Sequence, residues 1–86
     1  MTSFKYIMIK SCGLDTPVIF PEWLGHDEAA RMVFDKSSIL SAGFVTISKD
    51  EHGTIEAHCG QESVSLKIKS RPEDSDIITH YLSAGD

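Results

Sequence analysis

The segment Phe4-Lys5-Tyr6-Ile7-Met8-Ile9-Lys10-Ser11 decides the fold, because it is apolar at most of its positions. Successive side chains of a strand point to opposite faces of the sheet. In this segment one face carries Phe4, Tyr6 and Met8, and the other carries Ile7 and Ile9. Such a pattern is typical of a strand whose two faces are both covered. We therefore predict that residues 4–11 form a strand that is covered on both sides.

Turn residues follow this segment and predict a second, short strand. Cys12-Gly13-Leu14-Asp15 is typical of a turn, and a strand pattern resumes over residues 16–20. Proline lacks the backbone N–H that a central strand donates to its neighbour. Pro17 and Pro21 therefore confine this strand to a sheet edge or to a strand end.

Apolar residues spaced four apart predict a helix over residues 26–35. The spaced pairs are Ala29 with Val33 and Ala30 with Phe34. Acidic residues at its start and Lys36 after its end suit the two ends of the helix dipole. We expect Trp23 and Leu24, just before this helix, to pin its start to the core.

Three further strands are predicted after this helix. The longest covers residues 39–48, and Gly43 in its middle indicates a bulge or a close backbone neighbour. Residues 49–53 are typical of a hairpin loop, because Gly53 can take a positive φ. Strands over residues 55–59 and 64–69 follow, each with alternating apolar and polar side chains.

Ser70-Arg71-Pro72-Glu73 has the pattern of a capping box and predicts the start of a last helix that runs to about Ser83. In such a box the Ser70 hydroxyl and the Glu73 carboxylate each satisfy a backbone N–H of the first turn. The predicted fold class is therefore α+β, with the order β-β-α-β-β-β-α in a single domain of residues 1–86. Both helices are expected on one face of an antiparallel sheet.

The composition excludes several classes of function. Eight basic residues stand against thirteen acidic ones, and a pI near 5.2 argues against a domain held on nucleic acid by counterion release. No uncharged stretch approaches the roughly 20 residues that cross a bilayer. Lys10 also interrupts the only apolar run that resembles a signal peptide. We therefore expect a cytoplasmic protein that binds neither nucleic acid nor membrane.

Four histidines and two cysteines raise the alternative of a metal site or a cysteine nucleophile. The adjacent pair His58 and Cys59 lies on a predicted strand, where neighbouring side chains point to opposite faces and cannot chelate one ion. Cys59 shares the inward face of that strand, where a thiol behaves as a small apolar group. Cys12 lies in a turn with no cation beside it in sequence to activate it. We therefore assign no catalytic, metal or cofactor residue.

Acidic residues around the hairpin loops are candidates for partner binding: Asp50, Glu51, Glu56 and Glu62. Charge of one sign on loops can form a docking face for a basic protein, although it can also serve solubility alone. Phe20 and Trp23 lie beside the prolines at 17 and 21, and Trp23 is a candidate aromatic anchor for a partner. Core filling is the commoner role of such a side chain.

Four segments resemble small uncharacterised proteins encoded by bacteriophages and prophages: Pro17-Val18-Ile19-Phe20-Pro21, Ser41-Ala42-Gly43-Phe44-Val45, Ser63-Val64-Ser65-Leu66 and Ser70-Arg71-Pro72-Glu73-Asp74. The resemblance spans most of the chain. It implies an α+β accessory protein from a phage-derived region that acts in the bacterial cytoplasm. It implies no site residue, because none of these segments carries known chemistry.

We expect a non-enzymatic protein-interaction module, such as an acidic inhibitor of a host protein or defence complex. A folded chain of 86 residues buries only roughly 63% of its unfolded surface. Because residues 4–11 also need cover on two faces, we expect a homodimer. Two alternatives stay open, namely a small virion structural or assembly protein and a small metal- or cysteine-dependent enzyme.

Overall fold

The computed structural model describes residues 2–33, 39–63 and 66–84. Its largest element is a four-stranded antiparallel sheet with the strand order β2-β1-β3-β4. The strands of this sheet are β1 (Thr2–Ser11), β2 (Leu14–Phe20), β3 (Ile39–Lys49) and β4 (Ile55–Gly60). The other described elements are the helices α1 (His26–Val33) and α2 (Asp74–Ala84) and a small sheet of β5 (Glu62–Ser63) and β6 (Ile68–Lys69). The predicted α+β class with an antiparallel sheet is confirmed.

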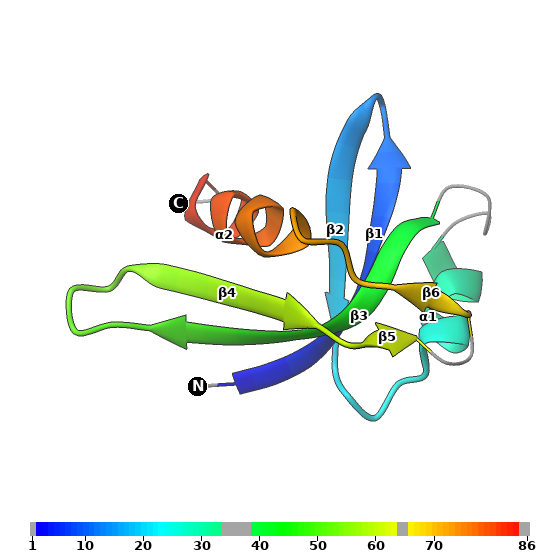
Figure 1. Cartoon of the computed structure of the whole chain (residues 1–86), viewed down its shortest axis with the longest axis horizontal. Helices are drawn as coiled ribbons and strands as arrows, with labels where there is room; N and C mark the ends of the chain where they lie inside the picture. Colours follow the sequence, from blue (N-terminus) through cyan, green and yellow to red (C-terminus); the bar gives the residue numbers. More distant parts are fainter. Residues whose placement is uncertain (1, 34–38, 64–65, 85–86) are drawn as a thin grey trace.

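The two hairpins of the main sheet point in different directions, and α2 lies in the angle between them (Figure 1). The hairpin of β3 and β4, called the arm below, projects along the longest axis of a body that measures 38 × 28 × 22 Å. The described residues contain no helix with the length and apolar character needed to cross a bilayer.

Both faces of β1 are covered, as its two apolar rows predict. On one face the α2-side cluster consists of Tyr6, Met8, Val45, Ala57 and Ile78. On the other face the α1-side cluster consists of Ile7, Ile9, Phe20, Ala29, Ala30 and Ala42. The helices therefore cover opposite faces of the sheet and not one shared face. The cover that β1 requires comes from within one chain, so this strand gives no reason to expect a second copy.

Both edges of the sheet carry features that disfavour pairing with a further strand. The backbone N–H groups of Ala57 and Cys59 on β4 donate to hydroxyl oxygens of α2, to Thr79 at 3.0 Å and to Ser75 at 2.8 Å. At the opposite edge, β2 contains Pro17, which has no N–H to donate. The predicted placement of that proline on an edge strand is confirmed. These devices protect a sheet against unwanted strand pairing.

Gly43 has a close backbone neighbour, as its position in mid-strand predicts. A Cβ at this residue would lie 2.5 Å from the carbonyl oxygen of Gly60 and 3.3 Å from that of Gln61. The sheet irregularity itself lies elsewhere, where β1 shifts register against β3 between Met8 and Ile9. Glycine is therefore required at 43 because the chain leaving β4 crosses directly over it.

The predicted strand over residues 64–69 is wrong at Leu66 and Lys67, which form a turn between β5 and β6. The Ser63 hydroxyl oxygen accepts a hydrogen bond from the Leu66 N–H at 3.3 Å, and Lys67 has a positive φ of 58°. A serine that bonds backbone three residues on favours a turn over an extended strand. The predicted residues 64 and 65 lie outside the described part of the chain.

The start of α2 is capped one residue later than predicted. The carboxylate of Asp74, and not that of Glu73, accepts the backbone N–H of Arg71 at 2.9 Å. Pro72 lies in the turn just before α2, where its missing N–H removes no helical hydrogen bond. The predicted end of the earlier helix at residue 35 lies outside the described residues, which follow α1 to Val33.

Candidate functional site

Trp23 projects from the loop between β2 and α1 with 82% of its surface exposed. The N–H of Leu24 donates to the carbonyl oxygen of Pro21 at 3.1 Å, which closes a turn over residues 21–24. Leu24 packs against the α1-side cluster. The expectation that both residues pin the helix to the core is right for Leu24 and wrong for Trp23, which points outward.

Two side chains hold this segment, called the Trp23 turn (residues 21–25), from its two sides. The Lys5 ammonium on β1 donates to the carbonyl oxygen of Leu24 at 3.1 Å. His26, the first residue of α1, donates from Nε2 to the carbonyl oxygen of Gly43 at 2.8 Å. The loop that displays Trp23 is thus tied to both β1 and β3.

His26 is 4% exposed and stands between two aromatic rings. Its ring meets those of Phe20 and Phe44 edge to face, with centroid separations of 5.4 and 5.7 Å. Burial lowers the pKa of His26 below its ordinary value, and the nearby Lys5 lowers it further. The hydrogen bond to Gly43 opposes that change. The neutral imidazole is therefore the form that fits this site.

Carboxylates lie beside the Trp23 turn. A Cβ at Gly25 would lie 2.8 Å from Oδ1 of Asp27 and 3.2 Å from Oε1 of Glu28, so both carboxylates cover the end of the turn. Glu22 is exposed within the turn itself. Two cations lie close to this surface among the described residues: Arg31 is 4.0 Å from Asp27, and the Lys5 ammonium bonds Leu24 within the turn. Trp23 is consequently displayed next to a mostly negative surface.

The predicted acidic candidates are divided between two places. Asp50 orders the loop of the arm, because its Oδ1 accepts the N–H groups of His52 and Thr54 at 2.9 Å each. Glu51 and Glu56 are exposed on the arm. Glu62 lies apart from them on β5, opposite Lys69 of β6. The structure therefore does not gather these four residues into one cluster.

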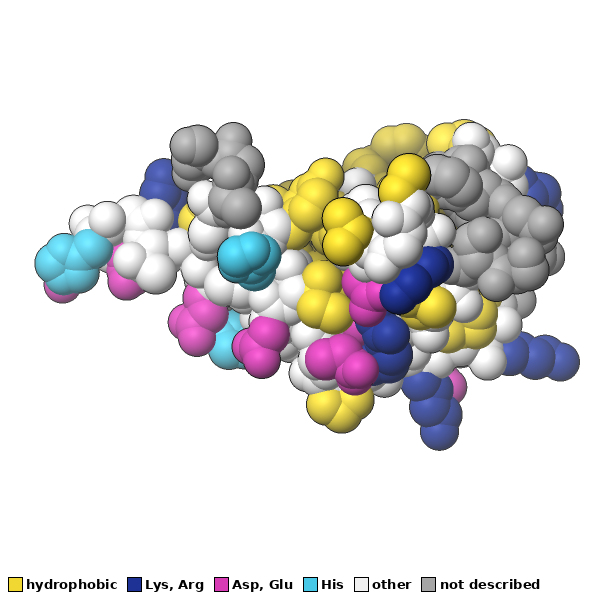
Figure 2. All heavy atoms as spheres, turned by 90° about the horizontal axis from the view of Figure 1, so that it is seen from above, with side chains coloured by type: hydrophobic (Ala, Val, Ile, Leu, Met, Phe, Trp, Pro, Cys, Tyr) yellow, Lys and Arg dark blue, Asp and Glu magenta, His cyan; other side chains and the backbone are white. Residues whose placement is uncertain are grey.

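On the arm, the exposed carboxylates lie beside histidine rings. Glu51 lies 3.6 Å from His52, and Glu56 lies 3.6 Å from His58. Figure 2 shows acidic side chains along the arm and the middle of the molecule, with most lysines and arginines toward the opposite end. The arm is thus a second negative surface, separate from the Trp23 turn.

A buried chain of polar groups links α2 to the sheet. The Tyr6 hydroxyl donates to Oδ2 of Asp74 at 2.5 Å, and both side chains are fully buried. Arg71 donates from Nε to Oδ1 of Asp74 at 3.0 Å and from Nη2 to Asp15 at 3.2 Å. Lys10 donates to the other oxygen of Asp15 at 3.2 Å. This chain crosses β1, β2 and α2.

The chain of polar groups has a structural role, because each charge in it has a partner. Burial, reinforced by Asp74, raises the pKa of Tyr6 far above its ordinary value, so the hydroxyl stays a donor. The hydrogen bond from Lys10 holds the pKa of Asp15 below its ordinary value. The sequence pattern places Arg71 only within the predicted capping box, and so misses this chain. The spacing of Arg71 and Asp74 by three residues was the available signal.

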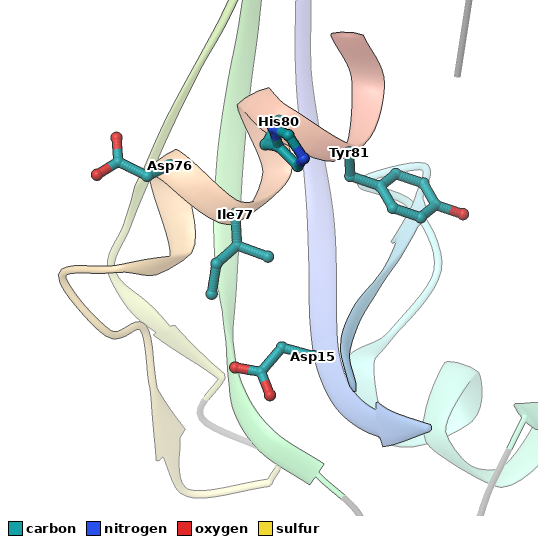
Figure 3. A pocket seen from close by; sticks show the side chains of 5 residues that line it. All are labelled: Asp15, Asp76, Ile77, His80 and Tyr81. Carbon is teal, nitrogen blue, oxygen red and sulfur yellow. The ribbon is translucent and has the colours of Figure 1, made fainter. Parts of the chain in front are cut away.

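A pocket of about 400 Å³ lies between β2 and α2. Its lining residues are Asp15, Asp76, Ile77, His80 and Tyr81. Figure 3 shows Ile77 pointing from α2 toward Asp15, whereas the Asp76 carboxylate points away from the other side chains. Asp15 already bonds Lys10 and Arg71, so its charge is matched within the chain. The pocket presents mainly apolar surface and no convergent set of reactive groups.

The cysteines occupy the two environments that the sequence predicts. Cys12 is exposed at the tip of the β1–β2 hairpin, and Cys59 is half-buried on β4. Burial raises the pKa of the Cys59 thiol, which disfavours the nucleophilic thiolate. Within residues 2–33, 39–63 and 66–84, no three side chains of His, Cys, Asp or Glu are grouped as metal ligands.

Comparisons with protein-family models, with curated proteins and with solved structures found no match to this chain. The function is therefore inferred from the geometry of the chain itself.

Proposed function

We propose that this protein is a non-enzymatic docking module that binds a basic protein surface, with Trp23 as its anchor. The observation that carries this proposal is the 82% exposure of Trp23 on a hydrogen-bonded turn. Tryptophan is among the residues most enriched in the few positions that dominate binding energy at interfaces. A loop residue displayed in this way is a candidate contact, because binding residues concentrate on loops held by a rigid scaffold.

The attachments of the Trp23 turn support this role. Lys5 and His26 tie it to two strands, and Leu24 packs beneath it. A contact side chain on a fixed backbone loses little conformational entropy when it binds, so more of the contact energy appears as affinity. The turn is thus organised for docking before a partner arrives.

The charges around the turn support a partner of defined chemistry. The carboxylates of Glu22, Asp27 and Glu28 would face the rim of an interface centred on Trp23. Their complement is an apolar pocket that accepts an indole ring and is rimmed by lysine or arginine. Complementary rim charge mainly speeds association and excludes wrong partners. The formal net charge of −5 acts in the same direction.

The resemblance to phage and prophage proteins supports a host target. An acidic docking module from a phage-derived region fits an inhibitor of a host protein or defence complex in the bacterial cytoplasm. The arm offers a second candidate docking face, because Glu51 and Glu56 have no lysine or arginine within 4 Å among the described residues.

The predicted homodimer is a further candidate assembly. Pro17 on one edge and α2 on the other disfavour strand pairing between copies. Two copies would therefore meet through exposed apolar side chains such as Trp23 and Met32. Sedimentation at about 100 µM that shows only monomer would overturn the dimer, because a standard-size interface is populated at that concentration.

Affinity capture from bacterial cytoplasm with paired variants tests the docking proposal. We expect Trp23→Ala to weaken capture of the main partner at least about tenfold, while the midpoint of thermal unfolding shifts by less than about 2 °C. Met32→Ala is the matched control, because Met32 is 72% exposed on α1 and outside the turn. Equal capture by wild type and Trp23→Ala, or no capture above background, contradicts the proposal.

A double Glu51→Gln and Glu56→Gln variant separates the two docking faces. Capture that survives this change and fails with Trp23→Ala assigns the partner to the turn. Capture that fails only with the double variant assigns the partner to the arm and overturns the role of Trp23.

A further inference from the structure

The two attachments of the Trp23 turn differ in chemistry. Lys5 carries a permanent charge at neutral pH and donates to Leu24 within the turn. His26 follows the turn immediately, and its Nε2–H group donates to the backbone of β3. Histidine is the side chain whose charge changes most readily near neutral pH. One of the two attachments can therefore be altered by a single proton.

The surroundings of His26 accept a neutral ring and oppose a charged one. β2 and β3 contribute the rings of Phe20 and Phe44, together with the carbonyl oxygen of Gly43. The charged groups that face the ring among the described residues are Lys5 from β1, which opposes a second cation, and Asp27 from α1, which favours it. Lys5 lies 5.8 Å from the centre of the Phe44 ring, so the two cationic groups would share one apolar corner.

We propose that His26 and Lys5 form a proton-sensitive clamp, so that protonation of His26 releases the Trp23 turn. The proton passes from solvent to Nδ1, since Nε2 already carries the hydrogen that bonds Gly43. The resulting imidazolium is a buried cation beside Lys5. It therefore moves out from between the Phe20 and Phe44 rings and becomes solvated. Movement of His26 draws the start of α1 and the adjoining turn away from β3.

This clamp deepens the proposed function, because it makes docking through Trp23 depend on pH. The closed clamp is the state that displays Trp23 in a fixed orientation. Burial moves the pKa of His26 below its ordinary value, so the clamp stays closed at neutral pH and opens under mild acid. A partner held through Trp23 would then be released as the pH falls.

The isolated chain provides the direct test, because Trp23 is its single tryptophan. We measure the fluorescence anisotropy of Trp23 and the exchange protection of the Leu24 amide from about pH 7.5 to about pH 5, a range that spans the ordinary histidine pKa. As the pH falls below the ordinary histidine pKa, protection of Leu24 should fall by up to about tenfold per pH unit, as expected for opening coupled to one proton. Anisotropy should fall over the same range.

Another amide of the same molecule shows whether the opening is local. The Ala57 N–H bonds Thr79 on the far side of the sheet, so its protection should stay constant while that of Leu24 falls. Equal loss at both amides indicates global unfolding and overturns the clamp. Anisotropy and Leu24 protection that stay constant while the His26 ring titrates by NMR also overturn it.

The matched variants are His26→Gln and His80→Gln. Glutamine retains an N–H donor and cannot titrate, so His26→Gln should abolish the pH response of the Trp23 turn. His80 is exposed on α2, and its replacement should leave the response unchanged. If His26→Gln does not fold, the NMR titration of the wild-type ring decides alone: its midpoint must coincide with release of the turn.

These readouts require no partner, so the two proposals fail separately. A normal pH response together with unaffected capture by Trp23→Ala retains the clamp and removes the docking role. Capture that depends on Trp23 but not on pH retains docking and removes the clamp.

Discussion

The two helices cover opposite faces of β1 and are held in different ways. Side-chain hydrogen bonds join α2 to the sheet: Asp74 accepts from Tyr6 on β1, and Thr79 accepts from the backbone of β4. Arg71, just before α2, links Asp74 to Asp15 on β2. α1 contributes small alanines to its cluster, and His26 at its first residue makes the hydrogen bond to β3. The α2 face is thus fixed by a polar network, and the α1 face depends on apolar contacts and one titratable ring.

This difference indicates where each face is vulnerable. The polar network fails when one member is removed, because its partners are left buried and unpaired. The α1 face is destabilised when His26, between the rings of Phe20 and Phe44, gains a charge. Substitutions in the network should therefore mainly weaken the α2 face, and a fall in pH should mainly weaken the α1 face.

The largest effect is expected from Asp74→Ala on the α2 face. The change leaves the Tyr6 hydroxyl and the Arg71 side chain without their buried acceptor, and it removes the cap of α2. We expect a loss of about 3–5 kcal/mol in the free energy of unfolding, measured by urea denaturation. Asp74→Asn, which keeps the shape and one acceptor, should cost less. An Asp74→Ala protein as stable as wild type would show that the network does not hold α2.

Gly43→Ala should cause the second-largest loss of stability, because Gly43 lies on β3, a strand that contributes to the clusters on both faces. The new methyl group would lie 2.5 Å from the carbonyl oxygen of Gly60, which is backbone and cannot move aside cheaply. We expect a loss of about 1–3 kcal/mol in thermal or urea unfolding, the usual range for overpacking. Gly60→Ala is the control, because nothing lies within 4 Å of a Cβ built there. Equal costs for the two variants would contradict the close approach over Gly43.

Acid should weaken the α1 face before the α2 face. The pKa of His26 is lowered on folding, so the unfolded chain binds a proton more readily below its ordinary value of 6.5, and stability falls as the pH drops from there. The pKa of Asp15 is also lowered, chiefly by Lys10, so its contribution is lost only as the pH falls below its ordinary value of 3.8. Urea unfolding across this range should show the earlier loss, and His26→Gln should remove it.

Alkali should weaken the α2 face. The pKa of Tyr6 is raised on folding, chiefly by burial, so the unfolded chain releases its proton first above the ordinary value of 10.0. Stability should therefore decline as the pH rises beyond that value. Tyr6→Phe should flatten the alkaline decline measured by urea unfolding, and an unchanged decline would contradict this assignment.

The smallest effect is expected from Ser41→Ala. Ser41 is fully buried on β3, and its hydroxyl oxygen has no hydrogen-bond partner among the described residues. Removing an unpaired buried hydroxyl should leave stability unchanged or raise it by about 1 kcal/mol. A clear loss in thermal unfolding would reveal a partner for this hydroxyl. Ser75→Ala is the contrasting control, because its hydroxyl accepts the Cys59 N–H.

The sequence predicts the need for cover on both faces of β1 but not what supplies it. Alternation along residues 4–11 is a local property, and it correctly indicates two buried rows. The helices that cover those rows are distant in the chain, and their placement depends on the coiling of the sheet. A second copy and a second helix satisfy the same local pattern, so the pattern alone could not distinguish them.

The candidate site was predictable only in part. The residue type of Trp23 and the nearby Pro21 mark it as a candidate, but its outward direction depends on a turn closed between Pro21 and Leu24. The pairing of Tyr6 with Asp74 joins residues 68 positions apart, and no local pattern encodes it. The alternation over residues 64–69 was too short to outweigh the turn that Ser63 begins.

The hydroxyls of Ser75 and Thr79 give α2 a task that usually falls to a neighbouring strand. By accepting the N–H groups of Ala57 and Cys59, they satisfy two backbone donors of β4 without adding a strand. Truncation of the chain after β6, which removes α2, would expose those groups together with the apolar side chains of the α2-side cluster. The truncated protein would then be prone to fibrous aggregation, so the integrity of α2 sets the solubility of the whole chain.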